Sequence, residues 1–139
     1  MVDEMRVHRL LRQAQDVVEF LDSEAALNPQ VRAHRRWLDS VKYNFIVAIE
    51  CCVAVGQHIC AVRGWGPPAS NADSFRILAE HGVLDPDLAA RMSRASGFRD
   101  VLVHEYVEVR DDLVVANLDR TGDIRGFVAA VAAWLVDSA

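Results

Sequence analysis

A long apolar run over residues 45–62 constrains the fold of this chain more than any other feature. Glu50, Gln57 and His58 interrupt the run, which favours a buried helix over a membrane span. On a helix these residues are apolar on nearly all sides, and such a helix belongs among other helices. We therefore expect a helix over about residues 30–63 at the centre of a bundle, and we do not expect a membrane as a partner.

The rest of the chain also has helical patterns. Apolar residues recur at three- and four-residue steps near the start of the chain, Ser70 and Asp73 form an N-cap pattern, and Pro86 follows a capping Asp85. Further helices are predicted over residues 3–27, 70–80, 85–105 and 124–136, with a short segment over 113–118 that leads past Thr121 and Gly122 into the last helix. The predicted fold class is all-α: one domain over residues 1–139, built as a largely antiparallel bundle of four to five helices.

The three cysteines, Cys51, Cys52 and Cys60, all lie in the apolar run. Their odd number and position argue against a disulfide framework and indicate a reducing compartment, so we expect a cytoplasmic protein. The spacing of His58 and Cys60 lacks the paired cysteines of zinc sites. We expect buried thiols, no metal site and no cofactor.

The net charge of -5 argues against a protein that coats nucleic acid by charge alone. A local basic patch remains possible because 14 of the 15 basic residues are arginines, which suit bidentate phosphate contacts. The arginines gather in three groups: Arg6, Arg9 and Arg12; Arg32, Arg35 and Arg36; and Arg91, Arg94 and Arg99. A solvated helix face is the alternative interpretation of the first two groups.

A cation, an imidazole and a phenol lie within eight residues of one predicted helix, at Arg99, His104 and Tyr106. Together these groups can bind and cleave a phosphodiester. On an ideal helix Arg99 lies inside the apolar stripe, Tyr106 is about 20° from it and His104 about 140° away. A desolvated arginine requires a carboxylate, a bound anion or an interface groove, and Glu50 is the candidate partner. A purely structural ion pair is the alternative for Arg99, and an exposed polar residue is the ordinary interpretation of His104 alone.

One straight helix cannot bring Arg99 and His104 onto a single phosphate. Either the helix unwinds near His104, or two copies of the chain pack about a twofold axis and present both motifs to one cleft. We expect the dimer.

The Arg-x4-His-x-Tyr spacing resembles the signature of the HepT toxins, which are helical proteins of the HEPN superfamily encoded beside a minimal nucleotidyltransferase antitoxin. The resemblance extends to residues 41–45 before the apolar helix, to the Gly-Pro-Pro break, to residues 75–82 and to Phe98 before Arg99. It implies a homodimeric, metal-independent RNA endonuclease that acts as a toxin. It assigns catalytic roles to Arg99 and His104, and it makes Tyr106 the residue that the partner nucleotidyltransferase adenylylates to silence the toxin.

Asp100 departs from this pattern, since relatives often place Asn after the arginine. Its carboxylate could repel phosphate, pair with Arg99, or raise the pKa of His104. We hypothesise that His104 is the general base or acid, that Arg99 stabilises charge on the phosphoryl group and that Glu50 orients Arg99. Cleavage through the ribose 2′-hydroxyl would spare DNA. The competing hypothesis is a non-catalytic binding subunit, in which Arg99 and Tyr106 line a docking surface for the nucleotidyltransferase.

Overall fold

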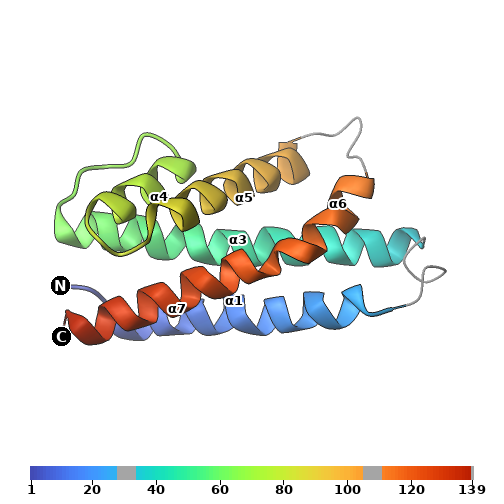
Figure 1. Cartoon of the computed structure of the whole chain (residues 1–139), viewed down its shortest axis with the longest axis horizontal. Coiled ribbons are helices and arrows are strands. Elements are labelled where there is room, and N and C mark those ends of the chain that lie inside the picture. Colours follow the sequence, from blue (N-terminus) through green and yellow to red (C-terminus); the bar gives the residue numbers. More distant parts are fainter. Residues whose placement is uncertain (28–33, 105–110, 139) are drawn as a thin grey trace.

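The computed structural model describes residues 1–27, 34–104 and 111–138, and in these residues every regular element is a helix (Figure 1). Five of the described helices have ten residues or more, so the predicted all-α class is confirmed. The elements in chain order are α1 (Glu4–Ala25), α3 (Arg35–Arg63), α4 (Asn71–Glu80), α5 (Pro86–His104), α6 (Asp111–Asn117), the 3-10 turn η1 (Leu118–Arg120) and α7 (Thr121–Asp137).

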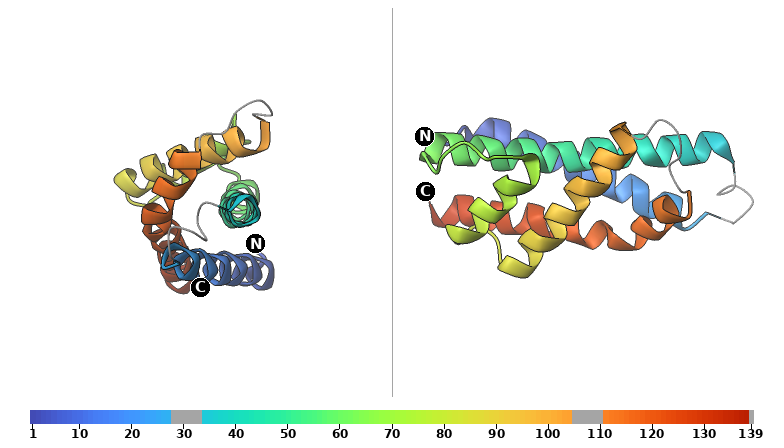
Figure 2. Two further views of the ribbon diagram at one scale, coloured as in Figure 1. Left: turned by 90° about the vertical axis from the view of Figure 1, so that its right-hand side faces the viewer. Right: turned by 90° about the horizontal axis from the view of Figure 1, so that it is seen from above.

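Four long helices, α1, α3, α5 and α7, alternate in direction along the long axis of the molecule (Figure 1). Neighbours in this series pack against each other, and α7 also packs against α1. In the end-on view of Figure 2, α5, α7 and α1 form an arc around α3. This arrangement confirms the predicted antiparallel bundle.

Helix α3 provides the middle of the core, as the apolar run predicts. It contacts α1, α4, α5 and α7, and it is the one described helix that is long and apolar enough to cross a membrane by length and composition alone. About half of its most apolar window, 56%, is buried by the other helices. One face stays exposed, however, and Glu50 and Gln57 lie on it, one heptad apart. The polar residues that interrupt the run therefore mark the part of α3 that faces solvent.

The three cysteines of α3 are buried free thiols, as predicted. Burial raises the pKa of each thiol, and the Glu50 carboxylate adds to the effect at Cys51. These thiols stay protonated near neutral pH, so they are packing groups rather than nucleophiles.

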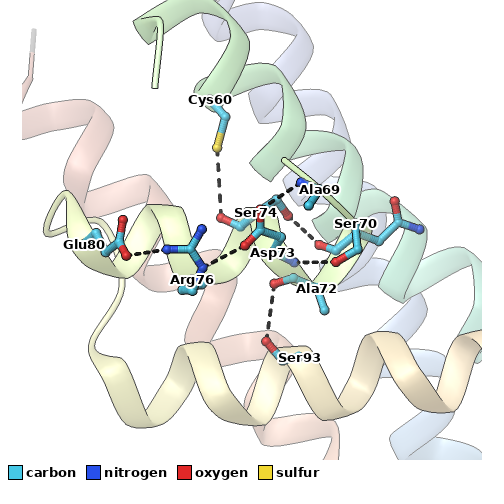
Figure 3. Close-up of polar contacts among 10 residues, drawn as sticks. Cys60, Ala69, Ser70, Ala72, Asp73, Ser74, Arg76, Glu80 and Ser93 are labelled. Carbon is cyan, nitrogen blue, oxygen red and sulfur yellow. Dashed lines mark hydrogen bonds and ion pairs between the residues drawn. The ribbon is translucent and has the colours of Figure 1, made fainter. Parts of the chain in front are cut away.

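Polar contacts at the start of α4 fix this helix between α3 and α5 (Figure 3). The Ser70 hydroxyl accepts a hydrogen bond from the Asp73 N–H at 3.1 Å, and the Asp73 carboxylate accepts one from the Ala69 N–H at 2.8 Å. The predicted N-cap is therefore present. Ser93 of α5 lies across the same turn, and its hydroxyl donates to the Ala72 carbonyl at 3.4 Å. The Ser93 contact thus joins α5 to the first turn of α4.

The last helix begins at Thr121, three residues before the predicted start. Thr121 and Gly122, predicted to precede this helix, instead lie in its first turn directly after η1. Thr121 is buried, and its hydroxyl donates to the Asp22 carboxylate of α1 at 2.6 Å. Arg125, one turn later, pairs with the same carboxylate. A tertiary contact with α1 therefore outweighs the local tendency of Thr-Gly to end a helix.

Candidate functional site

Arg99 of α5 and Glu50 of α3 form an ion pair where the two helices meet. The Arg99 Nε lies 3.1 Å from the Glu50 Oε1, and Nη2 contacts the same oxygen. Nη1 lies 2.9 Å from an Asp100 carboxylate oxygen. The predicted partner of Arg99 is therefore confirmed, and Asp100 is a second one.

Packing places the arginine at this boundary. On α5 the apolar stripe includes buried Leu88 and Met92 and partly buried Ala95 and Leu102. The Arg99 side chain, which continues this stripe, is 17% exposed, whereas that of Glu50 is 49% exposed. The guanidinium is thus mostly covered while its carboxylate partner faces solvent, so the pair lies at the rim of the core.

The electrostatics of this group favour a permanently charged guanidinium. Its hydrogen bonds to Glu50 and then to Asp100 raise the pKa of Arg99 above its ordinary value. A guanidinium has five N–H donors, and the contacts with described residues engage three of them, so within that part of the chain two remain for a phosphate. Ion pairs this close to solvent stabilise a fold only weakly. The clearer effect of Glu50 is to fix the direction in which Arg99 presents its free donors.

His104 is the last residue of α5, and its side chain is exposed. Among the described residues it has no hydrogen bond or ion pair. The helix continues through His104 without unwinding, so the imidazole stays about 140° around the helix from Arg99. A single chain therefore does not bring the two side chains together. Tyr106 lies outside the described residues.

The sequence profile of the ribonuclease HepT-like family matches residues 3–131. The chain belongs to this family. The family predicted from the Arg-x4-His-x-Tyr signature is thus confirmed, and ribonuclease is the class that the family description carries.

Two relatives of this HepT-like protein carry nuclease names. The mRNA nuclease HepT of Shewanella oneidensis is 34% identical over 77 residues, which are 55% of this chain and 58% of the relative. The tRNA nuclease HepT of Aphanizomenon flos-aquae is 30% identical over 60 residues, which are 43% of this chain and 41% of the relative. The aligned part of the chain thus spans about half of the length of these two relatives.

A solved structure has the same fold over nearly the whole chain. The tri-AMPylated HEPN toxin of Shewanella oneidensis, in complex with an MNT antitoxin, superimposes with a TM-score of 0.86 at 24% identity. The alignment covers 96% of this chain and 99% of that one. At this identity the similarity establishes the HEPN fold.

The other arginines of the third predicted group lie apart from Arg99. Arg91 pairs with Asp123 of α7 at 2.9 Å, while Arg94 is exposed and has no ion-pair partner among the described residues. Both line a cleft with Arg120 of η1. Sequence reasoning did not find this cleft, because Asp123 and Arg120 are about 30 residues away along the chain and no local pattern connects them to α5.

Proposed function

We propose that this HepT-like protein is a metal-independent endoribonuclease toxin that cuts RNA through the ribose 2′-hydroxyl. The observation that carries the proposal is the Glu50–Arg99 pair, which fixes a charged guanidinium with two free donors on the helix that ends at His104. The names of the two nuclease relatives support the same activity. DNA lacks the 2′-hydroxyl and is not a substrate of this chemistry. A cytoplasmic location gives the protein access to RNA.

The chemistry follows from the two side chains. One His104 imidazole removes the proton from the 2′-hydroxyl, and the 2′-oxygen attacks the adjacent phosphorus. The bond from phosphorus to the 5′-oxygen breaks, and a protonated imidazole returns a proton to that oxygen. Arg99 stabilises the negative charge that develops on the phosphoryl oxygens. The products carry a 2′,3′-cyclic phosphate and a free 5′-hydroxyl, and no step consumes a cofactor.

A homodimer completes the site in this proposal. Since α5 remains helical through His104, the second chain is the source of the imidazole that faces a phosphate held by Arg99. Two inactive variants provide the test. Arg99→Ala and His104→Ala chains mixed under conditions that exchange subunits should recover part of the wild-type cleavage rate. Heterodimers that form, as seen by native mass spectrometry, but remain inactive would instead favour local unwinding after His104.

The first experiment incubates the purified chain with structured RNA in EDTA, beside Arg99→Ala and His104→Ala. The expected products end in 2′,3′-cyclic phosphate, and both variants lose them. Cutting that requires a divalent metal ion would overturn the mechanism. Intact mass must first show that Tyr106 is unmodified, because a modified chain would be inactive whether or not the proposed mechanism is right.

The proposal includes a partner that silences the nuclease: the cognate minimal nucleotidyltransferase, which adenylylates Tyr106. The support is the sequence position of Tyr106, two residues after His104, and the AMPylated state of the Shewanella toxin in its complex. With this partner and ATP, the chain should gain mass in steps of one AMP and lose nuclease activity. Tyr106→Phe should gain no mass and keep its activity. A mass gain on Tyr106→Phe would place the modification elsewhere.

A second function, a non-catalytic binding subunit, is favoured by one observation. Two carboxylates, Glu50 and Asp100, surround the single cation of Arg99, and this excess of negative charge opposes phosphate binding. In this case the unmodified chain would form a stable complex with the nucleotidyltransferase and would leave RNA intact.

A further inference from the structure

A cleft of about 400 Å³ lies where α5 meets α3, η1 and α7. Its lining on α5 belongs to a different face of the helix from His104. The floor is apolar and includes Phe45 and Phe98, whose rings pack edge to face with 5.3 Å between their centroids. The cleft is therefore large enough for a small organic group and presents aromatic surface to it.

The rim of this cleft is basic. Arg91 is neutralised by Asp123, with 2.9 Å between Nε and the carboxylate. Arg94 and Arg120 are exposed and have no ion-pair partner among the described residues, and Asp119 is the other acidic residue of the lining. Three arginines thus face two aspartates in a chain whose net charge is -5. Free guanidinium groups over an aromatic floor match a ligand that has both an anion and a flat ring.

The cleft is a neighbour of the proposed catalytic pair. Phe98 and Ile49 line it, and each directly precedes a member of the Arg99–Glu50 pair. Arg94 lies five residues before Arg99, which corresponds to about 7.5 Å along the axis of α5 and about 140° around it. The two side chains are therefore separated by more than one nucleotide. A strand whose phosphate contacts Arg99 would reach the cleft by curving around α5.

We propose that the cleft is a subsite for one nucleotide of the RNA strand, more than one nucleotide away from the phosphate that Arg99 contacts. The base lies against Phe98, and the flanking phosphate lies between Arg94 and Arg120. The proposal rests on the ribonuclease function proposed above and adds the path of the strand. Because every base has a flat face, such a subsite contributes affinity without selecting a sequence.

The test measures binding in the full-length His104→Ala background, so that the probe stays intact. The probe is a fluorescein-labelled single-stranded oligoadenylate of about eight nucleotides, within the usual range of single-strand sites. Adding Arg94→Ala or Arg120→Ala should weaken binding by about tenfold each, as expected for loss of a charged phosphate contact. Each should also make the plot of log affinity against log salt shallower by about 0.7, the value for one phosphate on a single strand.

Matched controls distinguish loss of a contact in the cleft from a general effect of removing one positive charge from the protein. Arg6→Ala removes the same charge from an exposed position near the start of α1, at the end of the bundle where both termini lie (Figure 1). It should leave the affinity and the salt slope of the probe almost unchanged. Equal effects of Arg6→Ala and Arg94→Ala would overturn the proposal. Phe98→Leu, which keeps an apolar side chain, should weaken binding several-fold without changing the salt slope.

Three further outcomes are distinguishable. If AMP displaces the probe at concentrations as low as those of unlabelled oligoadenylate, the cleft holds a free nucleotide and the strand subsite is wrong. If wild-type protein fails to cleave RNA but the Arg94 and Arg120 effects are present, the subsite stands and the proposed nuclease function fails. If cleavage occurs and these effects are absent, the function stands and the subsite fails.

Discussion

Arg99 and His104 lie five residues apart on α5, and the protein holds them in different ways. The Arg99 side chain is largely covered and has two carboxylate partners. His104 is exposed at the end of the helix and has no polar partner among the described residues. The described part of the chain thus positions Arg99 but gives His104 no polar partner. In the proposed function, one chain supplies the electrostatic part of the site and the second chain supplies the acid–base part.

The largest expected effect comes from His104→Ala. RNA cleavage should fall by about 100- to 10,000-fold, the range for loss of a general acid or base. The melting temperature should stay the same because the side chain has no described contacts. Since the pKa of Arg99 is raised, that residue stays charged across the neutral range. His8→Ala, at an exposed position of α1, is the control. Full activity in His104→Ala would contradict the assignment.

Arg99→Lys tests whether the geometry of the arginine matters in addition to its charge. A lysine cannot contact Glu50 and a phosphate with a fixed planar group, so cleavage should fall by about 100-fold, as for loss of a preorganised charge-stabilising donor. Single-turnover rates would measure this effect. Arg6→Lys should cleave like wild type. Nearly full cleavage activity in Arg99→Lys would show that a positive charge at this position is sufficient.

Glu50→Gln should lower the cleavage rate by about tenfold, which corresponds to about 1.4 kcal/mol of lost positioning. The amide keeps the size of the side chain but loses the charge that holds Arg99. The effect should appear in kcat more than in KM, and stability should change little because the pair is near solvent. A raised kcat would contradict the positioning role of Glu50.

Asp100→Asn should have the smallest effect and the opposite sign. Removing one of the two carboxylates from Arg99 should increase RNA affinity by about twofold, the size expected for an exposed charge pair. Fluorescence anisotropy in the His104→Ala background would measure it. Asp87→Asn, in the first turn of the same helix, removes a charge elsewhere and should have no effect on RNA affinity. A loss of affinity in Asp100→Asn would mean that Asp100 orients Arg99 as Glu50 does.

The features that sequence reasoning found correctly are those with local causes. The N-cap at Ser70 depends on residues three positions apart, and α4 ends at Glu80 as predicted. Glu50 was identified as the partner of Arg99 because it is the one charged residue in an apolar run, and its pairing required only that α3 and α5 be neighbours. In each case the signal lies within one helix, although the Glu50–Arg99 contact itself joins residues 49 positions apart.

The features that sequence reasoning missed depend on distant residues. The start of α7 depends on the contact of Thr121 with Asp22, which is 99 residues earlier in the chain. The basic cleft depends on Arg120 and Asp123 meeting α5, and its ion pair joins residues 32 positions apart. No residue spacing within one helix predicts these contacts between helices.

The alternating directions of the long helices have a practical consequence for experiments. Both termini lie at one end of the bundle, whereas α5 runs away from that end, and its described part ends with His104, short of the far end of α3 (Figure 1). An affinity tag or fluorescent protein attached to either terminus would therefore project away from His104. Immobilisation through such a tag should leave His104 free to meet RNA or a second chain, which makes surface-based binding assays suitable for this protein.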